Sequence, residues 1–143
     1  MRQSSRFSYA LKALVDLAVH QGTGPVTVAA IAKRQAIPVR SLEQLFNLLR
    51  RKGLVEAARG PRGGYRLKKP ARQIQVKAIF ESVEPKALSL KKAAPTTDPA
   101  KAVWQQVEKA VAKSLEATTL ETLAAQARDQ APAPIAHRYT FHI

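Results

Sequence analysis

The sequence predicts a mainly α-helical protein with one short β-hairpin, and two observations support this fold class. Apolar residues recur at spacings of three and four through most of the chain between residues 5 and 127. A single region, residues 54–69, instead shows strand-like runs on either side of a glycine-rich break. With 143 residues, 45% of them hydrophobic, the chain can form one domain with a modest core, or a small domain with an appended element.

The first predicted helix covers residues 5–21. Ser5 is placed to cap its start, and Gly22 is expected to end it. One face of this helix carries the apolar residues Phe7, Leu11, Leu14 and Ala18. After the "TGP" loop, Thr27 is placed to cap a second, short helix that runs through Gln35.

A third helix follows a tight break at "QAIP". Pro38 suits a position just before or at its first turn, the helix runs to about Lys52, and Gly53 ends it. Its buried face is expected to consist of Leu42, Leu45, Phe46 and Leu49.

Two strand-like runs come next, "LVEAA" and "GYRLKK", joined by "RGPRG". The second run alternates, with Tyr65 and Leu67 on one side and Arg66 and Lys68 on the other. This pattern predicts a hairpin.

The C-terminal part is predicted to contain three more helices. Residues 74–83 form the first, and residues 85–99 are too rich in proline and lysine for regular structure. Asp98 then caps a long helix to about Ala117, and Thr118 or Thr119 caps a short last helix. The long helix carries an apolar stripe, namely Ala100, Trp104, Val107, Val111 and Leu115. The tail, residues 129–143, is broken by proline and then short and β-prone.

The charge of the chain is strongly positive and uneven. Lys and Arg number 24 against 10 acidic residues, which gives a net charge of +14. Residues 1–84 hold 16 basic and 5 acidic residues, and residues 85–143 hold 8 and 5. Such a balance favours binding to a polyanion, most commonly nucleic acid, through the N-terminal half.

Three helices followed by a hairpin describe a winged helix-turn-helix, in which the third helix can enter the major groove of DNA. The hairpin, or wing, would lie along the DNA backbone or reach the minor groove of the DNA. A narrow minor groove attracts arginine because its negative potential is concentrated. Base-facing candidates are Val39, Arg40, Ser41, Glu43 and Gln44, and phosphate-facing candidates are Asn47, Arg50 and Arg51. The wing and flanking candidates are Arg59, Gly60, Arg62, Gly63, Tyr65, Thr27, Arg2 and Arg6.

Simpler interpretations of these residues remain open. A polar helix face is often only solvated surface, and the wing arginines can be ordinary loop charges. Glu43 can also pair with Arg50 along the helix. The three glycines of the wing are expected to allow positive φ angles and a close approach of the backbone to phosphate.

Several classes of site are excluded or unsupported. The chain has no cysteine, which excludes disulfides, zinc–thiolate sites and thiol nucleophiles. His20, His137 and His142 are too scattered for a metal site and fit helix-end or tail positions. No nucleophile–base set or phosphate loop supports an enzyme. Without a signal peptide or an apolar run of about 20 residues, a cytoplasmic protein that binds no membrane is expected.

The stretches "FSYALKALVDLAVH", "VTVAAIAKRQAIPVRSLEQLFNLLRRKGLVEAARGPRGGYRL" and "TTLETLA" resemble the Rrf family of bacterial winged-helix transcriptional regulators, the group of IscR, NsrR and CymR. The match is close over residues 1–84 and looser to about residue 127. The resemblance implies a homodimer that binds double-stranded DNA, with a recognition helix at 39–52 and a wing at 54–68. It also implies that the helix at about 98–117 crosses to the partner subunit.

The apolar stripe of that long helix supports dimerisation independently. A helix of about 19 residues is roughly 28 Å long, and residues 1–84 cannot easily cover it. A two-fold partner could, with two recognition helices about 34 Å apart. The dimerisation candidates are therefore Trp104, Val107, Val111 and Leu115, and the alternative is that Trp104 and Val107 pack only within their own subunit.

The sequence departs from the family at its cofactor. Sensor members hold an iron–sulfur cluster with three cysteines in the loop after the fourth helix, whereas residues 85–99 here contain none. Lys101 stands three positions before the tryptophan, where some members place a ligating histidine. No cofactor and no metal are expected. The alternative function is a regulatory module whose loop (85–99) and tail (129–143) bind an unidentified protein or small-molecule effector, with DNA binding secondary.

The predicted organisation is thus a DNA-binding domain at 1–84, a loop at 85–99, a dimerisation helix with its following short helix at 98–128, and a tail at 129–143.

Overall fold

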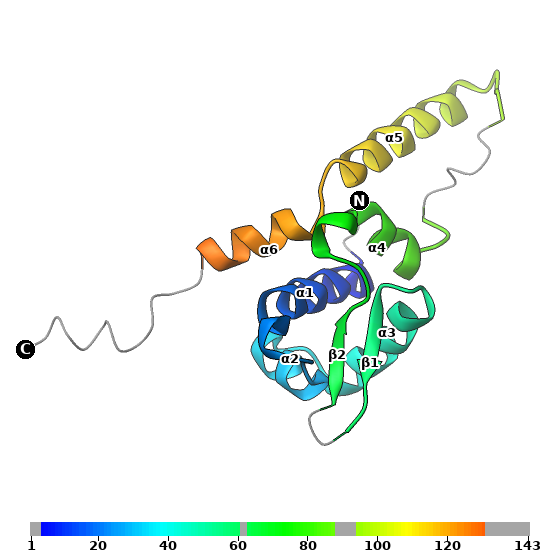
Figure 1. Ribbon diagram of the computed structural model, residues 1–143. Coiled ribbons are helices and arrows are strands. Elements are labelled where there is room, and N and C mark those ends of the chain that lie inside the picture. The colour runs from blue at the N-terminus through cyan, green and yellow to red at the C-terminus, as the bar shows by residue number, and fades with distance from the viewer. Residues whose placement is uncertain (1–3, 61–62, 88–93, 131–143) are drawn as a thin grey trace, which may run out of the picture.

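The computed structural model describes residues 4–60, 63–87 and 94–130 (Figure 1). It confirms the mainly helical class and the winged helix-turn-helix with its two-stranded hairpin. The helices are α1 (Ser5–His20), α2 (Val28–Gln35), α3 (Val39–Arg51), α4 (Val76–Val83), α5 (Pro99–Glu116) and α6 (Leu120–Asp129). The strands are β1 (Val55–Ala58) and β2 (Gly64–Leu67), and single 3₁₀ turns occupy Gln21–Thr23 and Ala71–Gln73.

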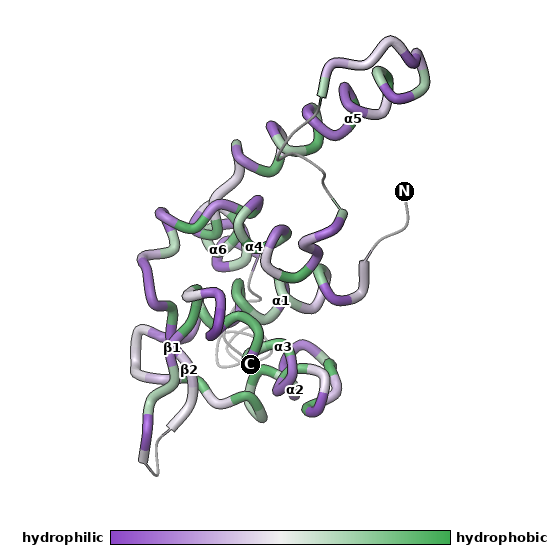
Figure 2. The backbone as a smooth tube through the Cα atoms, turned by 90° about the vertical axis from the view of Figure 1, so that its right-hand side faces the viewer, coloured by the Kyte–Doolittle hydropathy of each residue, from purple (hydrophilic) through white to green (hydrophobic). Residues whose placement is uncertain are grey.

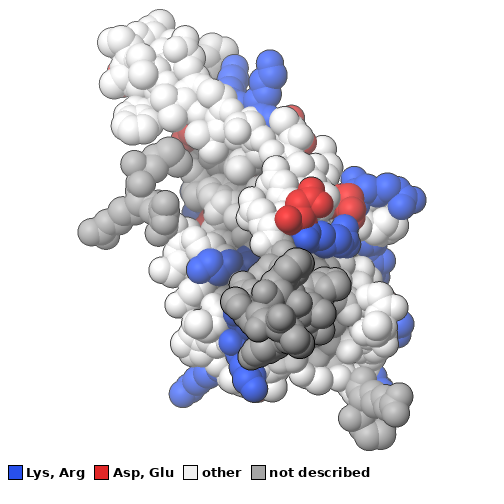
Figure 3. All heavy atoms as spheres, turned by 90° about the vertical axis from the view of Figure 1, so that its left-hand side faces the viewer, with Lys and Arg blue, Asp and Glu red and all other residues white. Residues whose placement is uncertain are grey.

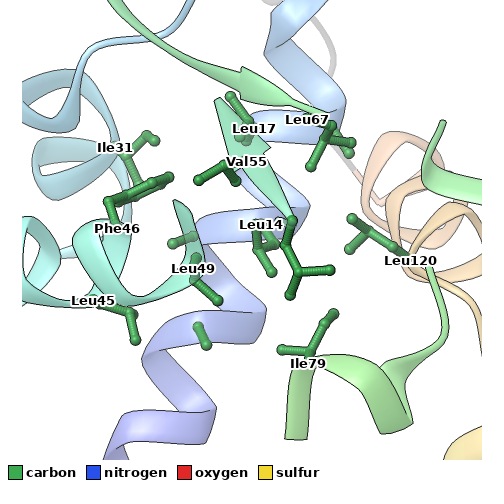
Figure 4. Close-up of a cluster of buried hydrophobic side chains, with 14 of the residues drawn as sticks. Leu14, Leu17, Ile31, Leu45, Phe46, Leu49, Val55, Leu67, Ile79 and Leu120 are labelled. Atoms are coloured by element: carbon green, nitrogen blue, oxygen red, sulfur yellow. The ribbon is translucent and has the colours of Figure 1, made fainter. Parts of the chain in front are cut away.

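The core lies where α1, α3 and the hairpin meet, and it is closed by α4 and α6 (Figure 4). Leu14, Phe46 and Leu49 are completely buried in it. All four residues expected on the buried face of α3 are indeed buried. Ile79 of α4 and Leu120 of α6 are also fully buried, so the C-terminal helices contribute to the same core. Burial of each such side chain contributes about 1.5–3 kcal/mol.

The predicted caps are confirmed for most helices. Thr27 Oγ1 accepts a hydrogen bond from the backbone N–H of Ala30 at 3.1 Å. Asp98 Oδ1 accepts one from Ala100 at 2.9 Å, and Thr119, rather than Thr118, caps α6. Each such cap satisfies a backbone donor that the first turn leaves unpaired.

Both ends of α1 differ from the prediction. Ser4, not Ser5, is the N-cap, because Ser4 has the extended conformation and accepts from the N–H of Phe7 at 3.2 Å. The helix ends at His20, and the 3₁₀ turn Gln21–Thr23 precedes the change in chain direction. The helix predicted at 74–83 likewise begins later, at Val76.

The hairpin is held to the helical part by a short third segment. Val55 pairs with Leu67 and Ala58 with Gly64 in the antiparallel register. Val26 then bridges to Tyr65 through two backbone hydrogen bonds of 2.9 and 2.8 Å. No strand was predicted at Val26, which follows the "TGP" loop. The added bridge fixes the wing relative to the start of α2.

The two C-terminal helices differ in how they pack. Helix α6 lies along α1, and its Ala124 is fully buried. Helix α5 projects from the body at the end away from the wing, as Figures 1 and 2 show, and Ala112 is its one residue that is buried among those described. Within the described ranges, no helix is long and apolar enough to cross a membrane.

Candidate nucleic-acid interface

Helix α3 presents a polar face to solvent. Its amphipathic sequence buries the side that carries leucine and phenylalanine and leaves the opposite side exposed to solvent. Val39 is 45% exposed, so its apolar side chain is open to a ligand. The exposed predicted residues are Val39, Arg40, Glu43, Gln44, Asn47, Arg50 and Arg51, and Ser41 is half-buried.

The charges on this face are available to a ligand. Arg40, Arg50 and Arg51 make no ion pair or side-chain hydrogen bond with another described residue. Glu43 also has no such partner, so the pairing of Glu43 with Arg50 is absent from the described part of the chain. Unpaired guanidinium groups suit phosphate and guanine, which both accept two hydrogen bonds.

The wing stands beside α3 because of an aromatic contact. The ring of Tyr65 stacks on Phe46, with centroids 4.6 Å apart and planes at 30°. The backbone of Tyr65 pairs with Val26 as described above. Tyr65 thus directs its ring toward Phe46 and is half-buried, and its contact with DNA stays a prediction.

Two of the three wing glycines have the positive φ angles that were expected. Gly60 and Gly64 have positive φ angles of 107° and 156°, but Gly63 does not. A Cβ on Gly63 would lie 2.9 Å from the carbonyl oxygens of Ala58 and Gly60, and one on Gly64 would lie 2.4 Å from that of Val26. At Gly63 and Gly64, the neighbouring backbone of the protein itself therefore leaves no room for a Cβ.

The basic residues around the wing and the N-terminus are only partly described. Arg59 is exposed before the turn, whereas Arg62 and Arg2 lie outside the described residues. Arg6 is exposed and donates from Nη1 to the carbonyl oxygen of Val83 at 3.3 Å. Thr27 is exposed, although its hydroxyl is engaged as a helix cap.

Basic side chains are not confined to α3. Figure 3 shows one face of the molecule, on which lysine and arginine side chains are spread out and acidic ones gather mainly in one place. On the wing, Glu56 is neutralised by Arg66, whose Nε lies 3.1 Å from its carboxylate. The described surface of α3 and the wing therefore keeps a clear excess of positive charge.

A buried ionic network behind α2 was not foreseen from the sequence. Asp16 of α1 is only 2% exposed and accepts two hydrogen bonds from Arg34, at 2.9 and 2.7 Å, and one from Gln35 at 3.0 Å. Burial raises the pKa of Asp16, but these hydrogen bonds and the charges of Arg34 and His20 together lower it below its ordinary value of 3.8. The ionised carboxylate ties α2 to α1.

The sequence lacks the thiolates of an iron–sulfur cluster, and the residues that the structure describes form no metal site. The sequence has no cysteine, and the described residues contain no group of three or more potential metal ligands. His20 Nδ1 lies 2.9 Å from the backbone oxygen of Asp16, at the end of α1. His137 and His142 lie outside the described residues.

The apolar stripe of α5 is largely uncovered. Trp104 is 65% exposed and Val107 is 39% exposed, while Val111 and Leu115 are half-buried near α4. Val103, which the sequence analysis did not include, is 58% exposed. Within the described part of the subunit, most of the Trp104 surface and about two fifths of the Val107 surface are therefore left uncovered.

Comparison with known families gives one match that covers most of the chain. The family model named Rrf2, described as "Iron-dependent Transcriptional regulator", matches residues 3–126.

Curated relatives match a little over half of the chain. The chain is 54% identical over 86 residues to the HTH-type transcriptional regulator IscR of Cereibacter sphaeroides, covering 59% of this chain and 56% of that one. It is 48% identical over 84 residues to the regulator of the same name from Serratia proteamaculans, covering 59% and 51%. The chain thus spans about half the length of these relatives.

Solved structures match along nearly the whole chain. The structure of CymR (YrzC), described as the global cysteine regulator of B. subtilis, superposes with a TM-score of 0.76 at 33% identity, covering 88% of this chain and 98% of that one. The IscR of T. potens superposes with a TM-score of 0.78 at 32% identity, covering 96% of each chain.

Proposed function

Because this chain belongs to the Rrf2 family of transcriptional regulators, we propose that it is a homodimer that binds double-stranded DNA and reads its sequence with α3. The observation that carries the proposal is the exposed face of α3, on which Arg40, Arg50 and Arg51 lie unpaired among described residues beside the wing. We also propose that the protein acts on the chromosome in the cytoplasm. We propose no catalytic role for it.

The two ends of α3 take different parts in recognition. When the N-terminal part of a recognition helix enters the major groove, its residues reach base edges. Arg40 can bond guanine through two hydrogen bonds, and Glu43 can accept from cytosine N4. Asn47, Arg50 and Arg59 are placed further along α3 or on the wing, where phosphates or the minor groove would meet them.

The exposed stripe on α5 supports the homodimer. A contiguous apolar surface of this kind on a regulator marks a protein–protein interface. We place the dimer contact at Trp104, Val107, Val111 and Leu115, with the DNA-binding domain at residues 1–84.

No iron–sulfur cluster takes part in this proposed function. Although the family model is described as iron-dependent, the cysteine-free sequence offers no thiolate ligand. We propose that any regulation comes through another route. The alternative, an effector-binding module, depends largely on segments 85–99 and 129–143, and no observation on their described parts favours it.

The test is sequence-selective binding. Preferred duplexes would be selected from a random pool with the purified protein, and binding of wild type, Arg40→Ala and Arg59→Ala would then be measured at two salt concentrations. We expect Arg40→Ala to relax specificity at one base position by about 1–3 kcal/mol. Arg59→Ala should weaken binding and reduce its salt dependence.

The matched control is Arg72→Ala, which removes an exposed arginine outside α3 and the wing. It should leave sequence preference unchanged. Equal affinity of the wild type for every duplex, or a monomeric protein in solution, would contradict the proposal.

A further inference from the structure

A polar groove separates the N-terminal part of α1 from α3. Its volume is about 470 Å³. The polar residues that line it are Ser5, Arg6 and Tyr9 from α1, and Ser41, Gln44 and Arg51 from α3. Segments some 40 residues apart in the chain thus form one concave surface.

The chemistry of the groove favours an anion. Arg6 and Arg51 line it together with residues that carry hydroxyl and amide groups, and none of its lining residues is acidic. The carboxylate of Glu84 accepts a hydrogen bond from the hydroxyl of Ser4 and does not line the groove. Leu45 and Leu48 contribute the apolar part of the lining, which reduces local solvation and strengthens a charge-assisted hydrogen bond.

The α1 side of the groove is held in place by α4. Arg6 donates to the carbonyl oxygen of Val83, and Phe7 meets Phe80 edge to face, with ring centroids 4.9 Å apart. These contacts fix the first turn of α1 before any ligand arrives, which lowers the entropic cost of binding.

The groove lies on one flank of α3, and the wing lies on the other. Phe46 packs under the wing through Tyr65. Leu45 and Leu48 line the groove, and at 100° per residue they fall on the side of α3 away from Phe46. A helix in the major groove has a sugar–phosphate backbone on each flank, so the wing side and the groove side would face different backbones.

We propose that this groove binds one backbone phosphate of the DNA, with Arg6 and Arg51 as the charged partners and the Tyr9 hydroxyl as a further donor. The inference rests on the proposed function and deepens it. It also reassigns Ser41 and Gln44, which were expected to face bases, to the backbone. The phosphate contact then sets how far α3 enters the major groove, without reading sequence.

The experiment neutralises phosphates one at a time. In a selected duplex, each phosphate in turn is replaced by an uncharged methylphosphonate, and affinity is measured for wild type, Arg51→Gln and Tyr9→Phe. For wild type, we expect one position in each half-site at which neutralisation weakens binding about tenfold, the scale of one charge-assisted hydrogen bond. The same replacement should change the affinity of Arg51→Gln by less than about twofold.

Arg50→Gln is the matched control. It removes a neighbouring arginine of the same helix that does not line the groove. It should lose sensitivity at a different phosphate and keep it at the groove phosphate. Tyr9→Phe keeps the ring that packs against the core and should show a partial loss at the groove phosphate alone.

The outcomes separate this inference from the proposed function. If wild type binds no duplex, the proposed function fails and the groove assignment fails with it. If wild type binds selectively but Arg51→Gln responds to every neutral linkage as wild type does, only the groove assignment is overturned. If no neutral linkage weakens wild-type binding through Arg51, yet millimolar inorganic phosphate raises the unfolding temperature of wild type and not of Arg51→Gln, the groove takes a free phosphate, and its assignment to the DNA backbone is wrong.

Discussion

Val39 is the residue at which exposure and chemistry fit recognition of a base most specifically. It lies at the first position of α3 and is 45% exposed, so its methyl groups are open to a partner. In the major groove, an apolar side chain can contact the methyl group of thymine. The proposed function therefore gives this exposed side chain a partner.

Replacement of one thymine by deoxyuridine tests this contact, since it removes only the methyl group. We expect one such replacement to weaken wild-type binding about fourfold, the effect of about 0.8 kcal/mol for one buried methyl-sized group. Val39→Ser should bind the two duplexes equally in a competition assay. A fourfold preference that persists in Val39→Ser would show that another residue reads the methyl group.

Asp16 has a structural effect that depends on pH. Its pKa is held below the ordinary value, so its interaction with Arg34 stabilises the fold fully above about pH 4 and is lost as the pH falls through the lowered pKa. We expect Asp16→Asn to lower the free energy of unfolding at pH 7 by about 2 kcal/mol. The difference between wild type and variant should shrink toward pH 3 in urea denaturation. Asp129→Asn, at the exposed end of α6, is the control and should show no such difference.

The sequence could not predict the Asp16 network because its partners are 18 and 19 residues away. Periodicity showed only that a charge interrupts an apolar stretch. The prediction of Ser5 rather than Ser4 as the cap of α1 was wrong for another reason. Two adjacent serines are equal candidates for a cap, and the choice depends on which of them adopts the extended conformation.

At the level of elements, helices were predicted within one or two residues wherever a cap and an apolar face agreed, as for α3 and α5. The candidate site on α3 followed from the same periodicity, because the polar face of a helix is fixed once its buried face is known. The bridge from Val26 to the wing could not be predicted, since a single paired residue leaves no alternating pattern. The packing of α6 on α1 likewise depends on tertiary contacts.

This bridge makes Gly64 the most restrictive position of the hairpin. Any Cβ there would meet the backbone oxygen of Val26 at 2.4 Å. We expect Gly64→Ala to reduce the free energy of unfolding by about 2 kcal/mol and to weaken DNA binding, because the wing would shift relative to α3. Gly22→Ala is the control, since nothing lies within 4 Å of its Cβ. Equal stability of the two variants, measured by thermal unfolding, would contradict this role of the bridge.

At the level of the whole molecule, the wing and the exposed stripe of α5 lie at opposite ends of the subunit (Figures 1 and 2). The surface proposed to bind DNA is therefore separate from the surface proposed to bind a second copy. A change on α5 can alter assembly without altering α3. If such a change lowers the affinity for DNA, the loss measures how much affinity is gained by binding two half-sites with one linked dimer.

Trp104→Glu exploits this separation, since Trp104 is 65% exposed on the stripe of α5. A charge at the centre of an apolar interface is costly to bury, so the variant should sediment as a monomer and bind a two-half-site duplex at least a hundredfold more weakly, roughly the avidity expected of linked sites. Gln106→Glu introduces the same charge at an exposed position about 160° around the helix, and it should remain dimeric. If Trp104→Glu is monomeric and keeps full affinity, one subunit alone binds the whole DNA site. The proposed two-fold arrangement of recognition helices would then be wrong.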